Sequence, residues 1–132
     1  MASENEAVVR RVYAAANARD MDAILADTHE DCEVHPVLGA NLAADVYRGH
    51  EGIRQWTRDL WGEWESFETT VGEVMERGDR LLYPVALRGR GRASGAPFET
   101  EIFHLTTVRD GLMFRMEGFS ERDSAQRAFE AT

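Results

Sequence analysis

The sequence predicts an α+β fold in which a strongly curved antiparallel or mixed sheet wraps around N-terminal helices and forms a cone with a central pocket. Apolar residues recur at helical spacing in the first half of the 132-residue chain. In the second half, turn signals such as Asp110-Gly111 separate strand-like runs. Helices followed by a meander of strands are typical of α+β domains with the helices on one face of the sheet. A bent sheet of this kind leaves a hollow between its concave face and the helices.

Two helices are predicted at the N-terminus. Ser3 followed three positions later by Glu6 has the form of a capping box. The apolar residues that recur at helical spacing after this cap are Val8, Val9, Val12, Tyr13 and Ala16. Residues 17–20 end this helix, and Asp20 can cap a short second helix. One side of the second helix carries Met21, Ile24 and Leu25.

The middle of the chain predicts a short strand and a third helix. Residues 32–35 are interpreted as a brief strand that Pro36 ends, and residues 37–46 as irregular. Gly49 begins the third helix. Its apolar stripe is expected to contain Ile53, Trp56, Leu60, Trp61 and Trp64.

Four strands and a terminal helix are predicted in the second half. The strands are expected at residues 69–75, 81–92, 98–108 and 112–119, and the helix at residues 121–131. Along the third of these strands Phe103 and Leu105 alternate with Ile102 and His104, so neither face of that strand is purely polar. We therefore expect a second subunit to cover the convex face of the sheet, which predicts a homodimer.

Composition narrows the class of protein. The chain predicts a single domain spanning residues 1–132, with 43% hydrophobic and 30% charged residues. A formal net charge of −9 argues against a nucleic-acid partner, and no apolar run is long enough to cross a membrane. The acidic N-terminus does not resemble a secretory signal. The one cysteine, Cys32, is interpreted as a small strand residue and is typical of a cytoplasmic protein.

Several short motifs carry a resemblance to a known family. They are Val12-Tyr13, the segment 17–20 (NARD), the segment 31–36 (DCEVHP), the segment 47–53 (YRGHEGI), the segment 77–80 (RGDR) and the segment 108–111 (VRDG). Together with the order of elements, they resemble the SnoaL-like branch of the nuclear transport factor 2-like superfamily. The resemblance implies the cone-shaped fold. It implies less about activity, because this fold is used by isomerases, cyclases, hydrolases and non-enzymatic modules.

The ketosteroid isomerase-like group of this superfamily offers a template for the site. By that resemblance His35, just before Pro36, takes the position of the catalytic base, and His104 that of an acidic hydrogen-bond donor. Trp56 matches an aromatic residue that lines the pocket, and Tyr13 lies one residue from the position of a tyrosine. No aspartate is predicted inside a strand, so neither a carboxylate base nor the Asp-Arg-Asp relay of the related epoxide hydrolases is supported.

Two imidazoles in an apolar hollow would suit proton transfer near an enolisable carbonyl. A neutral His35 can act as a general base, and His104 can donate a hydrogen bond to the developing oxyanion. The residues expected to bind the substrate are Trp56, Tyr47, Tyr83, Tyr13 and Met116. Either histidine could instead be structural, bonded to backbone or solvent. No metal-ligand spacing or nucleotide-binding loop is present, so neither a metal nor a cofactor is predicted.

Three functions remain open from the sequence. The first is a cofactor-independent enzyme of isomerase or polyketide-cyclase type that acts on a small apolar carbonyl compound. The second is a ligand-binding or dimerisation module without catalysis. The third is a hydrolase or dehydratase in which a histidine activates water.

Overall fold

The computed structural model describes residues 3–36 and 46–131. In chain order the elements are α1 (Glu4–Asn17), α2 (Met21–Ala26), β1 (Thr28–His35), β2 (Tyr47–Arg48), α3 (Gly49–Glu63), β3 (Trp64–Val71), β4 (Met75–Arg77), β5 (Arg80–Gly91), β6 (Pro97–Arg109), β7 (Leu112–Phe119) and α4 (Arg122–Glu130). The predicted α+β fold class is confirmed.

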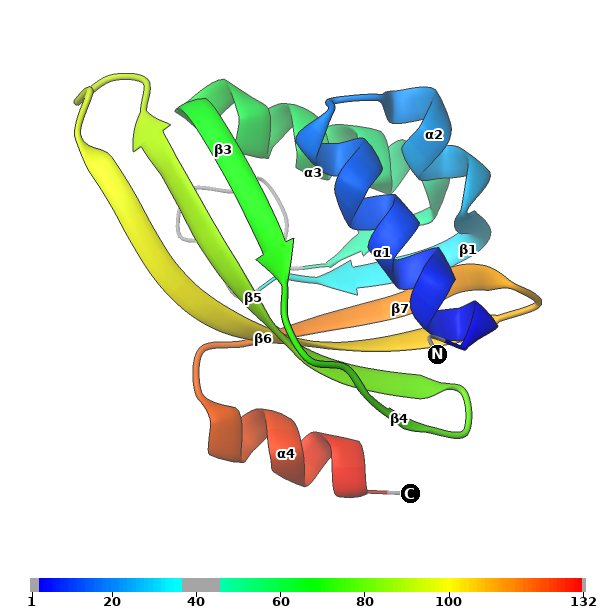
Figure 1. The fold of residues 1–132 in the computed structure, drawn as a ribbon. Helices are drawn as coiled ribbons and strands as arrows, with labels where there is room; N and C mark the ends of the chain where they lie inside the picture. Colours follow the sequence, from blue (N-terminus) through cyan, green and yellow to red (C-terminus); the bar gives the residue numbers. More distant parts are fainter. Residues whose placement is uncertain (1–2, 37–45, 132) are drawn as a thin grey trace.

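The sheet is mixed and strongly curled. Its strand order is β2-β1-β7-β6-β5-β3, and β4 pairs with β5 beside this path. β1 runs parallel to β7, whereas the pairs β5–β6 and β6–β7 are antiparallel. In Figure 1 the long strands β5 and β6 bend around α1, α2 and α3, and α4 lies on the opposite side of the sheet. The concave face and the three N-terminal helices therefore enclose the interior of the cone.

Side-chain caps begin the first two helices as the sequence predicts. The Ser3 hydroxyl accepts a hydrogen bond from the backbone N–H of Glu6 at 3.0 Å. The Asp20 carboxylate accepts one from the backbone N–H of Ala23 at 3.1 Å. Each cap satisfies a donor of the first helical turn, which has no partner inside the helix.

Three sequence-based boundaries are wrong. β1 begins at Thr28 and not at Cys32, so Asp31 lies inside a strand, where no aspartate was expected. Trp64 is extended, with φ −116° and ψ 129°, and it begins β3 instead of ending the α3 stripe. Its ring packs on Phe67 and Phe98, whose ring centroids lie 5.9 Å and 4.8 Å from that of Trp64, and these contacts favour the strand.

The predicted strand at 69–75 is in fact parts of β3 and β4. The irregular segment predicted at 37–46 lies, except for Val46, outside the described residues.

Apolar side chains pack on both faces of the sheet. The inner cluster lies between α1, α3 and the concave face, and includes Val9, Ile53 and Val85. On the convex face Phe103 and its neighbours pack against α4 in a second cluster, made of Leu82, Phe103, Leu105, Ala125 and Phe129. The chain's own C-terminal helix thus covers the outward residues from which the sequence predicted a second subunit. The homodimer stays a prediction.

One polar clamp joins α1 to β3 at the edge of the cone. The Asn17 amide donates to the Thr69 carbonyl at 2.8 Å, and its oxygen accepts from the Thr69 backbone N–H at 2.9 Å and from the Thr69 hydroxyl at 3.0 Å. We expect Asn17→Ala to lower the free energy of unfolding by about 1–3 kcal/mol, because three hydrogen bonds are lost. Urea unfolding of the variant measures this loss. Asn5→Ala, in the first turn of α1, is the control, and equal stability of the two variants would contradict the prediction.

Candidate active site

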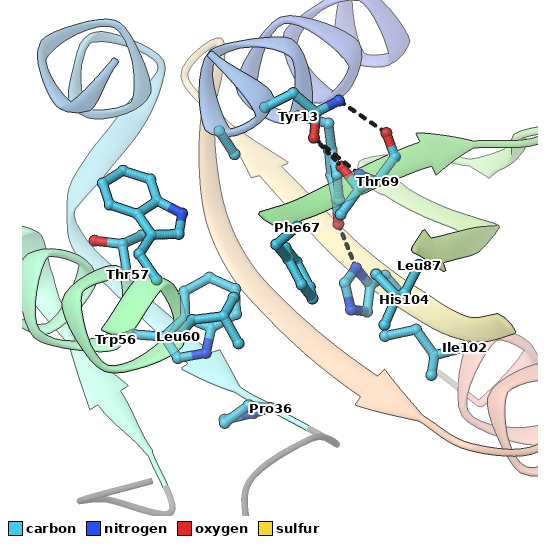
Figure 2. Close-up of a pocket in the computed structure, with 13 residues that line it drawn as sticks. Tyr13, Pro36, Trp56, Thr57, Leu60, Phe67, Thr69, Leu87, Ile102 and His104 are labelled. Atoms are coloured by element: carbon cyan, nitrogen blue, oxygen red, sulfur yellow. Dashed lines mark hydrogen bonds between the residues drawn. The ribbon is translucent and has the colours of Figure 1, made fainter. Parts of the chain in front are cut away.

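A pocket of about 80 Å³ opens between α1, α3 and the concave face of the sheet. Its wall is mostly apolar and is formed by Tyr13, Ala16, Asn17, Pro36, Trp56, Thr57, Leu60, Trp61, Phe67, Thr69, Leu87, Ile102 and His104. Figure 2 shows Trp56 and Leu60 of α3 on one wall and His104 and Ile102 of β6 on the other. The space is large enough for several water molecules or a small organic group.

His104 is the titratable imidazole on this wall. Only 7% of the residue is exposed, and its Nδ1 atom is hydrogen-bonded to the Tyr13 hydroxyl. Burial lowers the pKa of His104 to about 4, because the apolar surroundings disfavour the charged ring. The imidazole is therefore neutral at neutral pH, with one proton on one of its two ring nitrogens.

A buried chain of hydroxyl groups leads to His104. The Thr106 hydroxyl lies 2.6 Å from the Tyr83 hydroxyl, which lies 2.9 Å from the Tyr13 hydroxyl. Burial raises the pKa of Tyr83 to about 12 and the pKa of Tyr13 well above its ordinary value. Both phenols therefore keep their protons, and each can donate one hydrogen bond.

These contacts favour one tautomer of the His104 ring. The Tyr13 hydroxyl has two acceptors beyond Tyr83, which are Nδ1 of His104 and the Met116 sulfur at 3.2 Å. A thioether is the weaker acceptor, which favours donation from the hydroxyl to Nδ1. In that tautomer the proton of the neutral ring is on Nε2, for which the described part of the chain supplies no hydrogen-bond partner, and His104 offers an N–H donor to the pocket.

The structure places His35 away from this pocket. Cys32 and Val34 of β1 point into the core, so the alternation of the strand turns Glu33 and His35 to the other face. The His35 ring lies 3.1 Å from the Glu33 carboxylate, and 31% of its side chain is exposed. The prediction that the two imidazoles converge is therefore wrong. The prediction failed because a shift of one residue along a strand moves a side chain to the opposite face of the sheet.

A surface ion-pair network surrounds Glu33 instead. Its carboxylate lies 2.5 Å from Arg48 and 3.4 Å from Arg115, in addition to the contact with His35. The hydrogen bond from His35 and the two guanidinium groups lower the pKa of Glu33. His35 belongs to this network on the convex side.

The other predicted binding residues take three kinds of position. Tyr13 and Trp56 line the pocket as predicted. Tyr83 and Met116 lie behind Tyr13, within hydrogen-bonding reach of its hydroxyl. Tyr47 is buried at 2% exposure in β2, and its hydroxyl donates to Asp59 at 3.1 Å, so the expectation that it sits at the mouth is wrong.

Several residues of the wall were missed by the sequence analysis. Leu87 and Ile102 follow the same alternation as Tyr83 and His104 on β5 and β6, which is a signal that could have identified them. Phe67 was missed because β3 begins earlier than predicted. Thr69 lay in the predicted strand at residues 69–75 but was not identified as a residue of the pocket. Asn17 was interpreted only as the end of a helix.

The described residues supply neither a metal cluster nor a membrane span. Within residues 3–36 and 46–131, no group of three or more His, Cys, Asp or Glu side chains is arranged to hold a metal ion. In the same part of the chain, no helix has the length and apolar character that crossing a bilayer requires.

Comparisons with known proteins agree with this geometry. The family model described as a SnoaL-like domain matches residues 9–116. Among solved structures, TerC co-crystallised with polyporic acid is 24% identical, with a TM-score of 0.80 over 98% of this chain and 100% of that chain. A ketosteroid isomerase-like protein from Catenulispora acidiphila in complex with trimethylamine is 18% identical, with a TM-score of 0.75 over 89% of this chain and 88% of that chain.

A third structure carries a cyclase description. This candidate SnoaL-like polyketide cyclase from Jannaschia sp. CCS1 is 19% identical, with a TM-score of 0.76 over 98% of this chain and 93% of that chain. At these identities the three structures establish a shared fold and no activity. A comparison with curated protein sequences finds no match.

Proposed function

The chain belongs to the SnoaL-like domain family, and from that premise we propose that its pocket binds a small, largely apolar carbonyl compound. In this proposal the carbonyl oxygen accepts a hydrogen bond from Nε2–H of His104. The observation that carries the proposal is the buried, neutral His104 whose second ring nitrogen faces an apolar pocket. The complexes of TerC with polyporic acid and of the Catenulispora protein with trimethylamine support a small molecule as the ligand.

The same hydrogen bond can promote enolisation. When a proton leaves the carbon beside the carbonyl, negative charge gathers on the oxygen. A hydrogen bond to that oxygen becomes stronger, and it is strongest in surroundings with few competing dipoles. The proton passes to a solvent base and returns from solvent, which is a step of isomerase and cyclase reactions. His104 thereby keeps the donor role that the sequence predicted.

The third function suggested by the sequence receives less support. Activation of water by a histidine requires a ring nitrogen that accepts a proton. In the tautomer proposed for His104 the accepting nitrogen is Nδ1, which the Tyr13 hydroxyl already occupies. Hydrolysis or dehydration through histidine-activated water is therefore not proposed.

A ligand-binding protein without turnover is the second candidate. It is favoured by one observation, which is that no carboxylate is found among the described residues of the pocket wall. Catalysis would then depend on a base from solvent or from the ligand itself.

The test uses acetophenone, propiophenone and 1-indanone as probes. We expect their binding to perturb the NMR resonances of the pocket wall. We also expect the protein to accelerate exchange of the hydrogens beside each carbonyl for deuterium in D₂O. His104→Asn keeps an acceptor for the Tyr13 hydroxyl and removes the Nε2–H donor. This variant should lower the exchange rate by about a hundredfold or more, because the loss of one oxyanion donor costs about 2.7–4 kcal/mol.

His35→Asn is the matched control, since this histidine lies outside the pocket, and exchange should continue at the wild-type rate. Loss of exchange in that variant, or absence of binding by all three ketones, would contradict the proposal. Binding without any exchange would reject the enzymatic reading in favour of the second candidate.

A further inference from the structure

The Tyr13 hydroxyl is a branch point in the buried chain of hydrogen bonds. It lies 2.9 Å from the Tyr83 hydroxyl and 3.2 Å from the Met116 sulfur. It is also hydrogen-bonded to Nδ1 of His104, as Figure 2 shows. A hydroxyl group donates one proton and accepts with two lone pairs. Tyr13 therefore donates to one of these three neighbours, and that choice decides which nitrogen of the neutral His104 ring carries the proton.

The far end of the chain favours one direction of donation. Thr106 and Tyr83 are both 0% exposed, so solvent does not reach their hydroxyl groups. Within the described residues, the hydroxyl of Thr106 has the Tyr83 hydroxyl, at 2.6 Å, as its hydrogen-bond partner and no other. A buried donor without an acceptor is costly, which favours donation from Thr106 to Tyr83. In that direction Tyr83 donates its own proton to the Tyr13 oxygen.

Two arrangements of the Tyr13 proton remain. In the first, Tyr13 donates to Nδ1 of His104, and the ring carries its proton on Nε2. In the second, Tyr13 donates to the Met116 sulfur and accepts a hydrogen bond from Nδ1–H, so that Nε2 keeps a bare lone pair. The first arrangement offers a ligand an N–H donor, and the second offers it an acceptor.

The hydrogen bond from Tyr83 favours the first arrangement. A hydroxyl that accepts a hydrogen bond becomes a better donor, so Tyr83 strengthens the donation from Tyr13 to Nδ1. In the second arrangement Tyr83 and Nδ1–H would both donate to the same oxygen, and the Tyr13 proton would go to a thioether, which is a weak acceptor. Met116 is the competitor of Nδ1, because the second arrangement needs its sulfur.

We propose that Tyr83 is a positioning residue that keeps the proton of His104 on Nε2, and that the Met116 sulfur opposes it. The inference rests on the proposed function, in which Nε2–H of His104 binds the carbonyl oxygen of the ligand. Tyr83 lies behind Tyr13 and is not part of the described pocket wall, so it acts through Tyr13. In this way it selects ligands that accept a hydrogen bond over ligands that donate one.

The test locates the proton by the nitrogen NMR chemical shifts of the two His104 ring nitrogens, which differ strongly between a protonated and a bare nitrogen. Spectra are recorded at about pH 7, at which this ring is neutral. His104→Asn identifies the two signals by their disappearance. We expect the wild type to carry the proton mainly on Nε2. In Tyr83→Phe the population with the proton on Nδ1 should rise about two- to fivefold.

A second substitution should reverse this change. In Tyr83→Phe/Met116→Leu, Tyr13 loses the sulfur to which it donates in the second arrangement, so the proton should return to Nε2. Leucine and methionine are similar in volume, so the packing is largely kept. Tyr47→Phe is the matched control, because it also removes the hydroxyl of a buried tyrosine but one that is bonded to Asp59, outside the chain. This control should leave the His104 signals unchanged.

The outcomes separate this inference from the proposed function. Unchanged His104 signals in Tyr83→Phe would overturn the inference, and so would a double variant whose signals stay as in Tyr83→Phe. In both cases the ketone measurements still test the proposed function. A wild-type ring with its proton on Nδ1 would contradict both, because Nε2 would have no proton to donate. If Tyr83→Phe does not fold, Tyr83→Phe/Thr106→Val replaces it, because this pair also removes the hydroxyl that loses its acceptor.

Discussion

Replacing His104 with asparagine is expected to make the free energy of unfolding less dependent on pH, by about 3 kcal/mol between about pH 6.5 and pH 4. The pKa of His104 is about 4 in the folded protein, against an ordinary value of 6.5. Between these two values the unfolded chain binds a proton at this residue and the folded chain does not. Acid therefore favours unfolding, and the stability that the wild type has above about pH 6.5 is lost as the pH falls to about 4.

The measurement is the free energy of unfolding by urea at several pH values between about 7 and 4. The difference between the wild-type and His104→Asn curves should shrink or reverse toward low pH, because asparagine does not titrate. Carboxylates such as Glu33 titrate in both proteins, so their contribution cancels in the difference. Two curves that stay parallel over this range would show that His104 is not held neutral by burial.

Truncation of Phe129 is expected to destabilise the fold by about 3–5 kcal/mol. Phe129 is 7% exposed and packs α4 against the convex face, in the cluster that contains Phe103 and Leu105. Phe129→Ala removes most of this apolar contact and leaves a cavity under the helix. Chemical unfolding monitored by circular dichroism measures the loss.

Arg127→Ala is the control for this helix, because Arg127 is on the exposed side of α4. Its substitution should change the free energy of unfolding by less than about 0.5 kcal/mol. If Phe129→Ala were as stable as this control, α4 would not be held on the sheet as the structure describes. The convex face would then be open to a second subunit, and the homodimer prediction would gain in weight.

Local signals in the sequence were sufficient for the helices and for most strands. Ser3 and Asp20 cap the helices that their positions predict, because a capping side chain acts within one turn of its own residue. The Asp110-Gly111 turn joins β6 to β7, and both of its residues have positive φ. Trp64 was misplaced because its apolar spacing continues the α3 stripe. Its contacts with Phe67 and Phe98, which are 31 positions apart in the sequence, favour a place for Trp64 in β3.

By itself the sequence determined the α+β class, the order of helices and strands, and the presence of His104, Trp56 and Tyr13 on elements that line the pocket. Caps, turns and alternation act between near neighbours, so they can be interpreted without coordinates. Only the tertiary structure decided that His35 faces away, that Tyr83 and Thr106 orient His104 through Tyr13, and that the Trp56 nitrogen has no acceptor. Those facts depend on strand phase and on distances between residues far apart in the chain, which no local pattern specifies.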